Sequence, residues 1–357
     1  MCAQTVDRRT DPAGWANWLG ISKEAVDLYL ASDVIDLHVD SFIWTRIFGY
    51  DLHRRHGKGI FGDSFYSQVD LPRAISGGLT GATWVISTNP FLPAPLRKRQ
   101  FLRNLPWLEA TLARHPEVAI VRTEAEYRAA RAQGKHGAFI GVQGGNCLDT
   151  SIDDLDLIPD RGVLRITLVH LTSSRLGPTS SPASRLGGRS EGLTDFGREY
   201  VRKLDEKKIF VDLAHIGRKA FFDAVEVHDR TKPLIVTHTG VEGVHPHWRN
   251  LTDDQLRTIA ETGGTIGVMY QKSFLGRGEV TSRTVVDHLE HIVKVVGEDH
   301  ASLGSDWDGA ISPPADLATP EMLPNLVEEM LRRGWSPERV RKILGGNFLR
   351  ALKMLRG

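Results

Sequence analysis

The feature that most constrains the fold is a repeated alternation of short apolar runs with amphipathic stretches. Several runs are β-branched-rich and apolar on both faces, as strands buried under helices are. The runs cover 34–38, 81–87, 137–142, 163–169, 209–215, 233–238, 264–270 and 300–306. Stretches with helical periodicity cover 96–115, 123–133, 195–207, 218–228, 252–262, 282–297 and 320–333. Eight strands alternating with helices predict an α/β fold, a (β/α)8 barrel of the TIM type.

The domain organisation follows from the absence of any boundary signal. The 357 residues are long enough for two domains at about 150 residues each. However, we find no linker, internal repeat or low-complexity tract that would separate two domains. We therefore predict one domain, with a helical N-terminal extension at 1–32, the barrel at 33–310 and C-terminal helices at 311–357.

The composition excludes several classes of protein. Lys and Arg number 45 against 44 Asp and Glu, so the net charge of +1 gives no field that would attract nucleic acid. The two cysteines cannot form a disulfide framework. No segment has the pattern of a signal peptide or a run of about 18 apolar residues. We expect a cytoplasmic protein with no nucleic-acid partner and no membrane anchor.

Metal-binding residue types recur where the predicted strands end. His38 and Asp40 close the first strand on one face of the pleat. This pair alone is weak evidence, because an aspartate can also simply hold a strand-end histidine. Later strands end in further such residues, namely His170, His215, His238 and Asp306. Since the strand ends of a barrel meet at one mouth, these side chains predict a site for zinc, which binds imidazole and carboxylate.

Two long connections also follow predicted strands. Residues 41–67 are rich in aromatic residues and glycine, and residues 171–192 are rich in serine, glycine and proline. Long loops on this face of a barrel are usually functional. We expect both to form walls or lids over the mouth.

Several motifs together resemble the membrane (renal) dipeptidases, zinc peptidases among the amidohydrolase-like metal-dependent barrels. The resemblance covers about residues 33–355. It is specific because the motifs occur together, and no single motif would be sufficient. It rests on DLHVD (36–40), GVQGGNCLD (141–149), LRITLVHLTSS (164–174), GLTDFGREYVRKL (192–204), VDLAH (211–215), THTGVEGVHPHWRNLTDD (237–254), LGSDWDG (303–309) and GGNFLRAL (345–352). The resemblance implies hydrolysis of dipeptides by metal-activated hydroxide and, as a further expectation, a homodimer.

The resemblance also implies a role for each residue of the site. One metal would lie on His38 and Asp40, and a second on His215 and His238. His170 would contact the substrate and stabilise the oxyanion. Arg249 would bind the terminal carboxylate of the dipeptide, and Asp306 would carry the proton from the attacking water to the leaving amine.

One residue departs from the pattern of the family. The bridging ligand is a glutamate in the family, whereas Gln143 stands at that position here. A neutral amide offers one carbonyl oxygen and no charge, so two Zn²⁺ ions would repel each other more strongly. We hypothesise one tightly held metal at His215 and His238, with a second, at His38, Asp40 and Gln143, that is weak or absent.

Gln143 keeps two other functions open. The chain could hydrolyse another amide or a lactone with the same metal, since a fold does not determine a substrate. It could also be a catalytically silent relative that binds a peptide-like ligand. Of the other histidines, His288 and His291 are interpreted as solvated or capping residues, and His115, His136 and His228 as surface residues.

Overall fold

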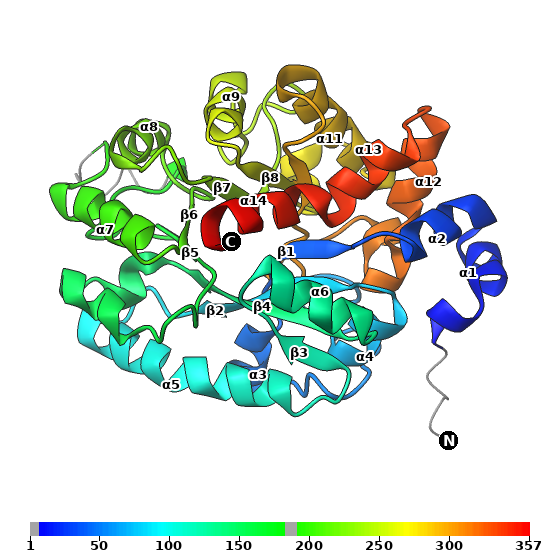
Figure 1. The fold of residues 1–357 in the computed structure, drawn as a ribbon, viewed down its shortest axis with the longest axis horizontal. Coiled ribbons are helices and arrows are strands. Elements are labelled where there is room, and N and C mark those ends of the chain that lie inside the picture. Colours follow the sequence, from blue (N-terminus) through cyan, green and yellow to red (C-terminus); the bar gives the residue numbers. More distant parts are fainter. Residues whose placement is uncertain (1–6, 183–190) are drawn as a thin grey trace.

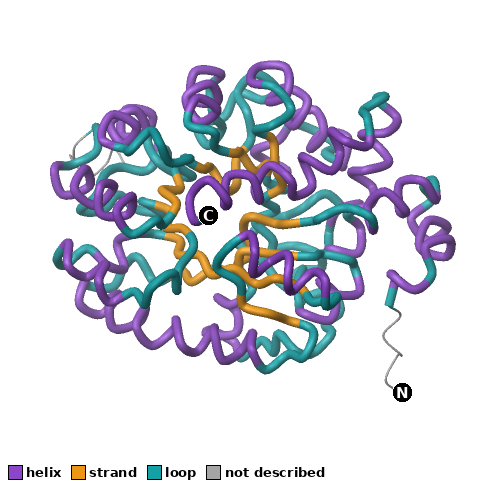
Figure 2. Tube along the Cα trace, viewed as in Figure 1, coloured by secondary structure: helices purple, strands orange, loops and turns teal. Residues whose placement is uncertain are grey.

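The strands form a closed parallel barrel in the computed structural model, which describes residues 7–182 and 191–357 (Figures 1 and 2). The strands are β1 Ile35–Val39, β2 Gly81–Ser87, β3 Val118–Ile120, β4 His136–Gln143, β5 Arg165–Thr167, β6 Phe210–Asp212, β7 Ile235–Thr239, β8 Thr265–Val268 and β9 Ala301–Leu303. The ring runs β2-β1-β9-β8-β7-β6-β5-β4 and closes by pairing β4 with β2. The predicted TIM-type barrel is therefore confirmed. The short β3, which pairs only with the first part of β4, was not predicted.

Helices surround the ring of strands. They are α1 Pro12–Leu19, α2 Lys23–Leu30, α3 Phe42–Phe48, α4 Leu71–Ser76, α5 Ala94–Ala113, α6 Glu124–Ala132, α7 Asp195–Glu206, α8 Arg218–Val227, α9 Asp253–Glu261, α10 Lys272–Leu275, α11 Ser282–Val296, α12 Pro324–Arg332, α13 Pro337–Arg341 and α14 Asn347–Arg356. A π-helical turn, Lys342–Gly346, joins the last two. Among them, α1 and α2 extend to one side, where α2 packs against α12 (Figure 1).

The two long connections both contribute residues to the pocket described below, and the first of them contains an unexpected helix. Residues 41–67 were predicted as loop, but α3 forms there and ends at Gly49, whose φ of 68° is left-handed. Glycine adopts this conformation without a Cβ clash, so it terminates the helix. Of the second connection, residues 183–190 lie outside the described part of the chain, and Thr179, Ser180 and Ser181 line the pocket described below.

An apolar cluster closes the end of the barrel opposite the site. Phe348 and Leu352 of α14 pack with Ile35, Phe210 and Ile235, the first residues of β1, β6 and β7. Figure 1 shows α14 lying across the ring of strands. Side chains fill this end of the barrel, whereas a pocket opens at the opposite mouth, at the carboxyl ends of the strands.

Three histidines are buried, namely His136 and His228, which were expected at the surface, and His288, which was expected to be solvated or capping. His288 joins two segments: its Nδ1 accepts from the Val241 amide at 2.9 Å, and its Nε2 lies 2.9 Å from the Leu275 carbonyl oxygen. The expected exposure to solvent was wrong, because a ring with both nitrogens paired can be buried without losing hydrogen bonds.

The burial of His288 predicts a loss of stability in acid. Burial lowers the pKa of His288 from 6.5 to about 4, so the unfolded chain takes up a proton that the folded chain does not. The difference in pKa corresponds to about 3 kcal/mol in the free energy of unfolding. This stability is fully present above pH 6.5 and is lost as the pH falls toward 4. We expect His288→Gln, which can donate and accept as the ring does, to remove this part of the pH dependence. Urea unfolding at about pH 7.5 and pH 5 measures it, and equal pH dependence in both proteins would contradict the assignment.

Candidate functional site

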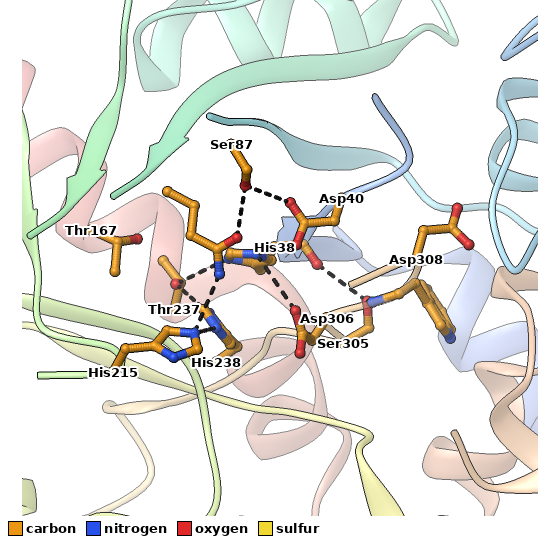
Figure 3. Close-up of polar contacts among 12 residues, drawn as sticks. His38, Asp40, Ser87, Thr167, His215, Thr237, His238, Ser305, Asp306 and Asp308 are labelled. Atoms are coloured by element: carbon orange, nitrogen blue, oxygen red, sulfur yellow. Dashed lines mark hydrogen bonds and ion pairs between the residues drawn. The ribbon is translucent and has the colours of Figure 1, made fainter. Parts of the chain in front are cut away.

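Histidines from separate strands meet at the mouth of the barrel. The ring centroids of His38 and His238 lie 3.8 Å apart, those of His215 and His238 4.8 Å apart, and those of His170 and His215 4.9 Å apart. The Nε2 atoms of His215 and His238 are separated by 2.8 Å. Figure 3 shows His38, His215 and His238 pointing toward one another and toward Asp40 and Asp306. The structure thus brings together the strand-end residues that the sequence singled out.

Irregular backbone aims these side chains inward. The register of β1 against β2 shifts between Asp36 and Val39, on either side of His38, and that of β7 against β8 shifts in the same way around His238. His215 and Asp306 adopt left-handed φ values of 65° and 64°. Each such residue costs about 1–3 kcal/mol and persists where the surrounding structure enforces it, often at functional sites. The strand ends are therefore shaped for the site at some expense in stability.

Two carboxylates complete the cluster. Asp40 Oδ2 lies 3.3 Å from His38 Nε2, and Asp306 Oδ1 lies 3.6 Å from the same nitrogen. Burial, reinforced by the neighbouring Asp40 carboxylate, raises the pKa of Asp306 well above its ordinary value. A carboxyl group tuned in this way suits proton transfer, because its affinity for a proton is raised toward that needed near neutral pH.

The side chain of Gln143 lies among these residues, but its neutral amide group cannot bind as a carboxylate does. Its Oε1 accepts from the Ser87 hydroxyl at 2.9 Å, and its Nε2 lies 3.3 Å from His215 Nε2. The amide group therefore turns its nitrogen toward the histidines, and nitrogen of an amide is a donor, not a ligand. Gln143 therefore offers no carboxylate at the position where the resemblance implied a bridging ligand.

Beneath the histidines lies a polar layer that the sequence analysis missed. Arg165 and Asp212 are fully buried, with a separation of 3.2 Å between Arg165 Nη1 and Asp212 Oδ2. Thr167 and Thr237 also contact Asp212, through hydroxyl oxygens at 2.5 Å and 2.7 Å. The signal that could have revealed the layer is a charged residue inside an otherwise apolar strand, since charges are almost never buried unpaired.

A pocket of about 330 Å³ opens above the cluster. Its apolar walls include Ile43 and Trp44 from α3 together with Trp248, Phe274 and Ile311. The polar side chains that reach it include Asp40, Gln143, His170, His215, Arg249 and Asp306. A small apolar-walled pocket with a few convergent polar groups is typical of a site for a small molecule.

Arg249 places a cation in this pocket. The side chain is buried, its Nη2 donates to the His238 carbonyl at 2.8 Å, and its Nε has no hydrogen-bond partner among the described residues. Burial lowers the pKa of Arg249 to about 10, so the group remains charged at neutral pH. A buried guanidinium with free donors is suited to an anionic group on a bound molecule.

The donor set fits a divalent metal ion. One nitrogen of His38, one nitrogen of His238 and one oxygen of Asp306 lie within 4.8 Å of one another, and His215 Nε2 lies beside His238 Nε2. Burial holds the pKa values of His215 and His238 well below the usual range, so both rings are neutral, the form that binds metals. Imidazole nitrogen with carboxylate oxygen is a donor set that zinc accepts.

Comparison with known proteins finds a family model and solved structures that match most of the chain. Residues 22–356 match the family model described as membrane dipeptidase, peptidase family M19. The chain is similar to the solved dipeptidase AC, a metallopeptidase, with 29% identity, a TM-score of 0.78 and coverage of 91% of this chain and 98% of that one. It is also similar to a metallopeptidase from Rhodobacter sphaeroides bound to a phosphinate mimic of L-Ala-D-Ala, with 27% identity, a TM-score of 0.79 and coverage of 91% and 99%.

Proposed function

Because this chain belongs to the membrane dipeptidase family, we propose that it is a metal-dependent dipeptidase acting on dipeptides with a free terminal carboxylate. The match extends over residues 22–356, which includes every residue of the site. The predicted activity class, a metallo-dipeptidase, is confirmed by this membership. The metal, the roles of individual residues and the substrate preference are our proposals.

The observation that carries the substrate proposal is the guanidinium of Arg249. It is a buried cation in a pocket of about 330 Å³, and its Nε is unpartnered among the described residues. The pocket is large enough for a small molecule but not for a long peptide chain. A planar guanidinium binds a carboxylate through two parallel hydrogen bonds. Arg249 therefore supports a small substrate with a free carboxylate.

Zinc is the metal we propose, held by His215 and His238. A bound zinc ion supplies Lewis-acid polarisation of a carbonyl group and lowers the pKa of water toward about 7. A second ion at His38, Asp40 and Gln143 would lack the bridging carboxylate, and we propose that it is weakly held or absent.

Two residues of the chain would act on the substrate. Burial lowers the pKa of His170 to about 4, so at neutral pH it is a neutral ring with one N–H that can donate to the oxygen of the attacked carbonyl. Asp306, with its raised pKa, would take the proton from the attacking water and deliver it to the leaving amine. Both residues line the pocket that also contains Arg249.

A panel of L,L and L,D dipeptides and their C-terminal amides, assayed with and without Zn²⁺, tests the proposal. We expect hydrolysis of dipeptides that depends on metal. Arg249→Met is expected to lower kcat/KM by at least about 30-fold, since removing one partner of a buried charge pair costs about 2–5 kcal/mol. The dipeptide amides should be poor substrates for both proteins and insensitive to Arg249→Met. Turnover confined to other amides or lactones, or tight binding without turnover, would refute the dipeptidase proposal.

The cellular setting is a further part of this proposal. No helix within the described residues is long and apolar enough to cross a membrane. We propose a cytoplasmic location, which the buried free thiol of Cys147 supports because no disulfide holds it. We also propose that the protein forms a homodimer, which light scattering of the purified protein would test.

A further inference from the structure

Two large apolar side chains are exposed at the pocket, next in sequence to the two residues that would hold the substrate. Leu171 follows His170 directly, and Trp248 precedes Arg249 directly. Leu171 is 58% exposed and Trp248 is 43% exposed, and both line the pocket. A single exposed apolar side chain is ordinary. Two of them on the wall of one pocket form a surface that an apolar group of a bound molecule can cover.

The backbone of Leu171 is strained. Its φ of 45° lies in the left-handed region, and the Thr172 amide donates to the His170 carbonyl across it, which closes a tight turn. A bulky residue rarely adopts this conformation, because its Cβ crowds the backbone, whereas asparagine adopts it more readily. Since the leucine side chain is largely exposed, burial within the free protein does little to offset the cost. Strained residues of this kind cluster at binding sites.

The Trp248 ring is held in place by its neighbours. It packs edge-on to the ring of Phe274, with centroids 5.8 Å apart, and its centroid lies 4.9 Å from that of His247. Asn250 Nδ2 donates to the Phe274 carbonyl at 2.7 Å, which joins this loop to α10. The aromatic wall beside Arg249 is therefore formed before a substrate binds.

The covalent structure of a dipeptide relates these two side chains to one part of the substrate. The C-terminal residue is the one that lies between the attacked carbonyl and the terminal carboxylate. His170 would donate to the oxygen of that carbonyl, and Arg249 would bind that carboxylate. Because Leu171 and Trp248 are the immediate neighbours of these two residues and line the same pocket, they border the C-terminal residue. Its side chain is the part of the substrate that can cover them.

We propose that Leu171 and Trp248 form an apolar subsite for the side chain of the C-terminal residue, so that the protein prefers dipeptides in which this side chain is large and apolar. The proposal deepens the proposed function and rests on it. A substrate of this kind covers the exposed leucine and thereby offsets the strain of its backbone. A dipeptide that ends in glycine leaves both Leu171 and Trp248 exposed to water.

The first experiment compares kcat/KM of the wild type for Ala-Leu, Ala-Asn and Ala-Gly, with the C-terminal residue in both its L and D forms. Leucine and asparagine have side chains of nearly the same shape, so this pair isolates polarity. One methylene group in an apolar pocket contributes about 10-fold or more to specificity. Within the stereochemical series that is cleaved faster, we therefore expect Ala-Leu to exceed the other two by at least about 10-fold.

The outcomes of this comparison separate the subsite from the activity. Equal kcat/KM values for the three dipeptides, or a preference for Ala-Asn, would overturn the subsite while the dipeptidase function stands. Absence of hydrolysis for every dipeptide, with metal supplied, would overturn the proposed function and the subsite with it.

The second experiment measures the same rates for Trp248→Ala and Leu171→Asn. We expect the ratio of kcat/KM for Ala-Leu to that for Ala-Gly to fall by about 10-fold in Trp248→Ala and by at least about 3-fold in Leu171→Asn, since each variant removes apolar area that the substrate would cover. A fall of equal size for both dipeptides would indicate a general disturbance of the site and would overturn the proposal. Trp18→Ala and Leu157→Asn change side chains that are 45% and 46% exposed outside the pocket, and as matched controls they should leave the ratio unchanged.

The stability of Leu171→Asn gives a readout that a merely structural role would move in the opposite direction. Asparagine tolerates a left-handed φ better than leucine does, and the leucine side chain is largely exposed. We therefore expect the melting temperature of the variant to equal or exceed that of the wild type, although its preference for Ala-Leu is reduced. A lower melting temperature would show that Leu171 stabilises the free protein and would overturn the assignment of its strain to substrate binding.

Discussion

Replacing His215 by alanine is expected to remove the bound metal and to lower dipeptide hydrolysis by at least about 10³-fold. His215 Nε2 lies 2.8 Å from His238 Nε2, and a site with only one of the two imidazoles would bind zinc far more weakly. Polarisation by a metal contributes several kcal/mol to lowering a reaction barrier, and each 1.36 kcal/mol is a factor of ten in rate. Metal content by mass spectrometry and kcat/KM on a cleaved dipeptide measure the two effects.

A histidine outside the cluster serves as the matched control for His215→Ala. His115 is partly exposed and packs beside His53, away from the four histidines of the mouth. We expect His115→Ala to keep both the zinc content and the rate of the wild type. Full activity of His215→Ala with its zinc retained would show that the metal is held elsewhere.

Asp306→Asn is expected to lower kcat by about 10²–10⁴-fold while the protein keeps its metal, the range that a positioned general acid or base contributes. Asparagine has nearly the same shape as aspartate but cannot carry a proton between the water and the amine. It also tolerates the left-handed φ of 64° at this position better than alanine does, so the backbone should remain as it is. We expect KM to change little, because Arg249 still binds the carboxylate of the substrate.

Asp308→Asn provides the contrast for Asp306→Asn. Asp308 shares the φ of 64° and is buried, but its carboxylate accepts from the Ser41 hydroxyl and from the amides of Gln68 and Val69. Asp308 therefore holds the segment after β1 against the segment after β9. Its substitution should reduce the stability of the protein far more than it reduces kcat. A larger fall in kcat for Asp308→Asn than for Asp306→Asn would reverse the roles we assign to them.

The barrel was predictable because its signals are local. Each strand is a run of apolar, β-branched residues, and each helix has its own periodicity, as in α9, whose first turn carries a capping box of Thr252 and Gln255. The strand β3 and the helix α3 were missed for local reasons as well. Three residues are too few to show a pattern, and the aromatic and glycine-rich composition of 41–67 concealed seven helical residues.

The position of the site was predictable to the same degree, since strand ends of a barrel converge. His38, His170, His215, His238 and Asp306 lie together as the strand-end argument implied, and their roles as ligand, donor or base remain predictions. Buried histidines such as His288 were misjudged, because helical position alone does not show whether a neighbouring segment supplies partners for both ring nitrogens.

By itself, the sequence determined the fold class, the family and the set of residues at the mouth of the barrel. These depend on residue type and on spacing along the chain, which periodicity and motifs express directly. Only the tertiary structure decided which histidine nitrogen faces a donor and which faces an acceptor. Arg165 and His38 are far apart in sequence, yet Arg165 Nη2 lies 2.8 Å from His38 Nδ1. Hydrogen-bond direction depends on neighbours in space, and no pattern along one chain contains it.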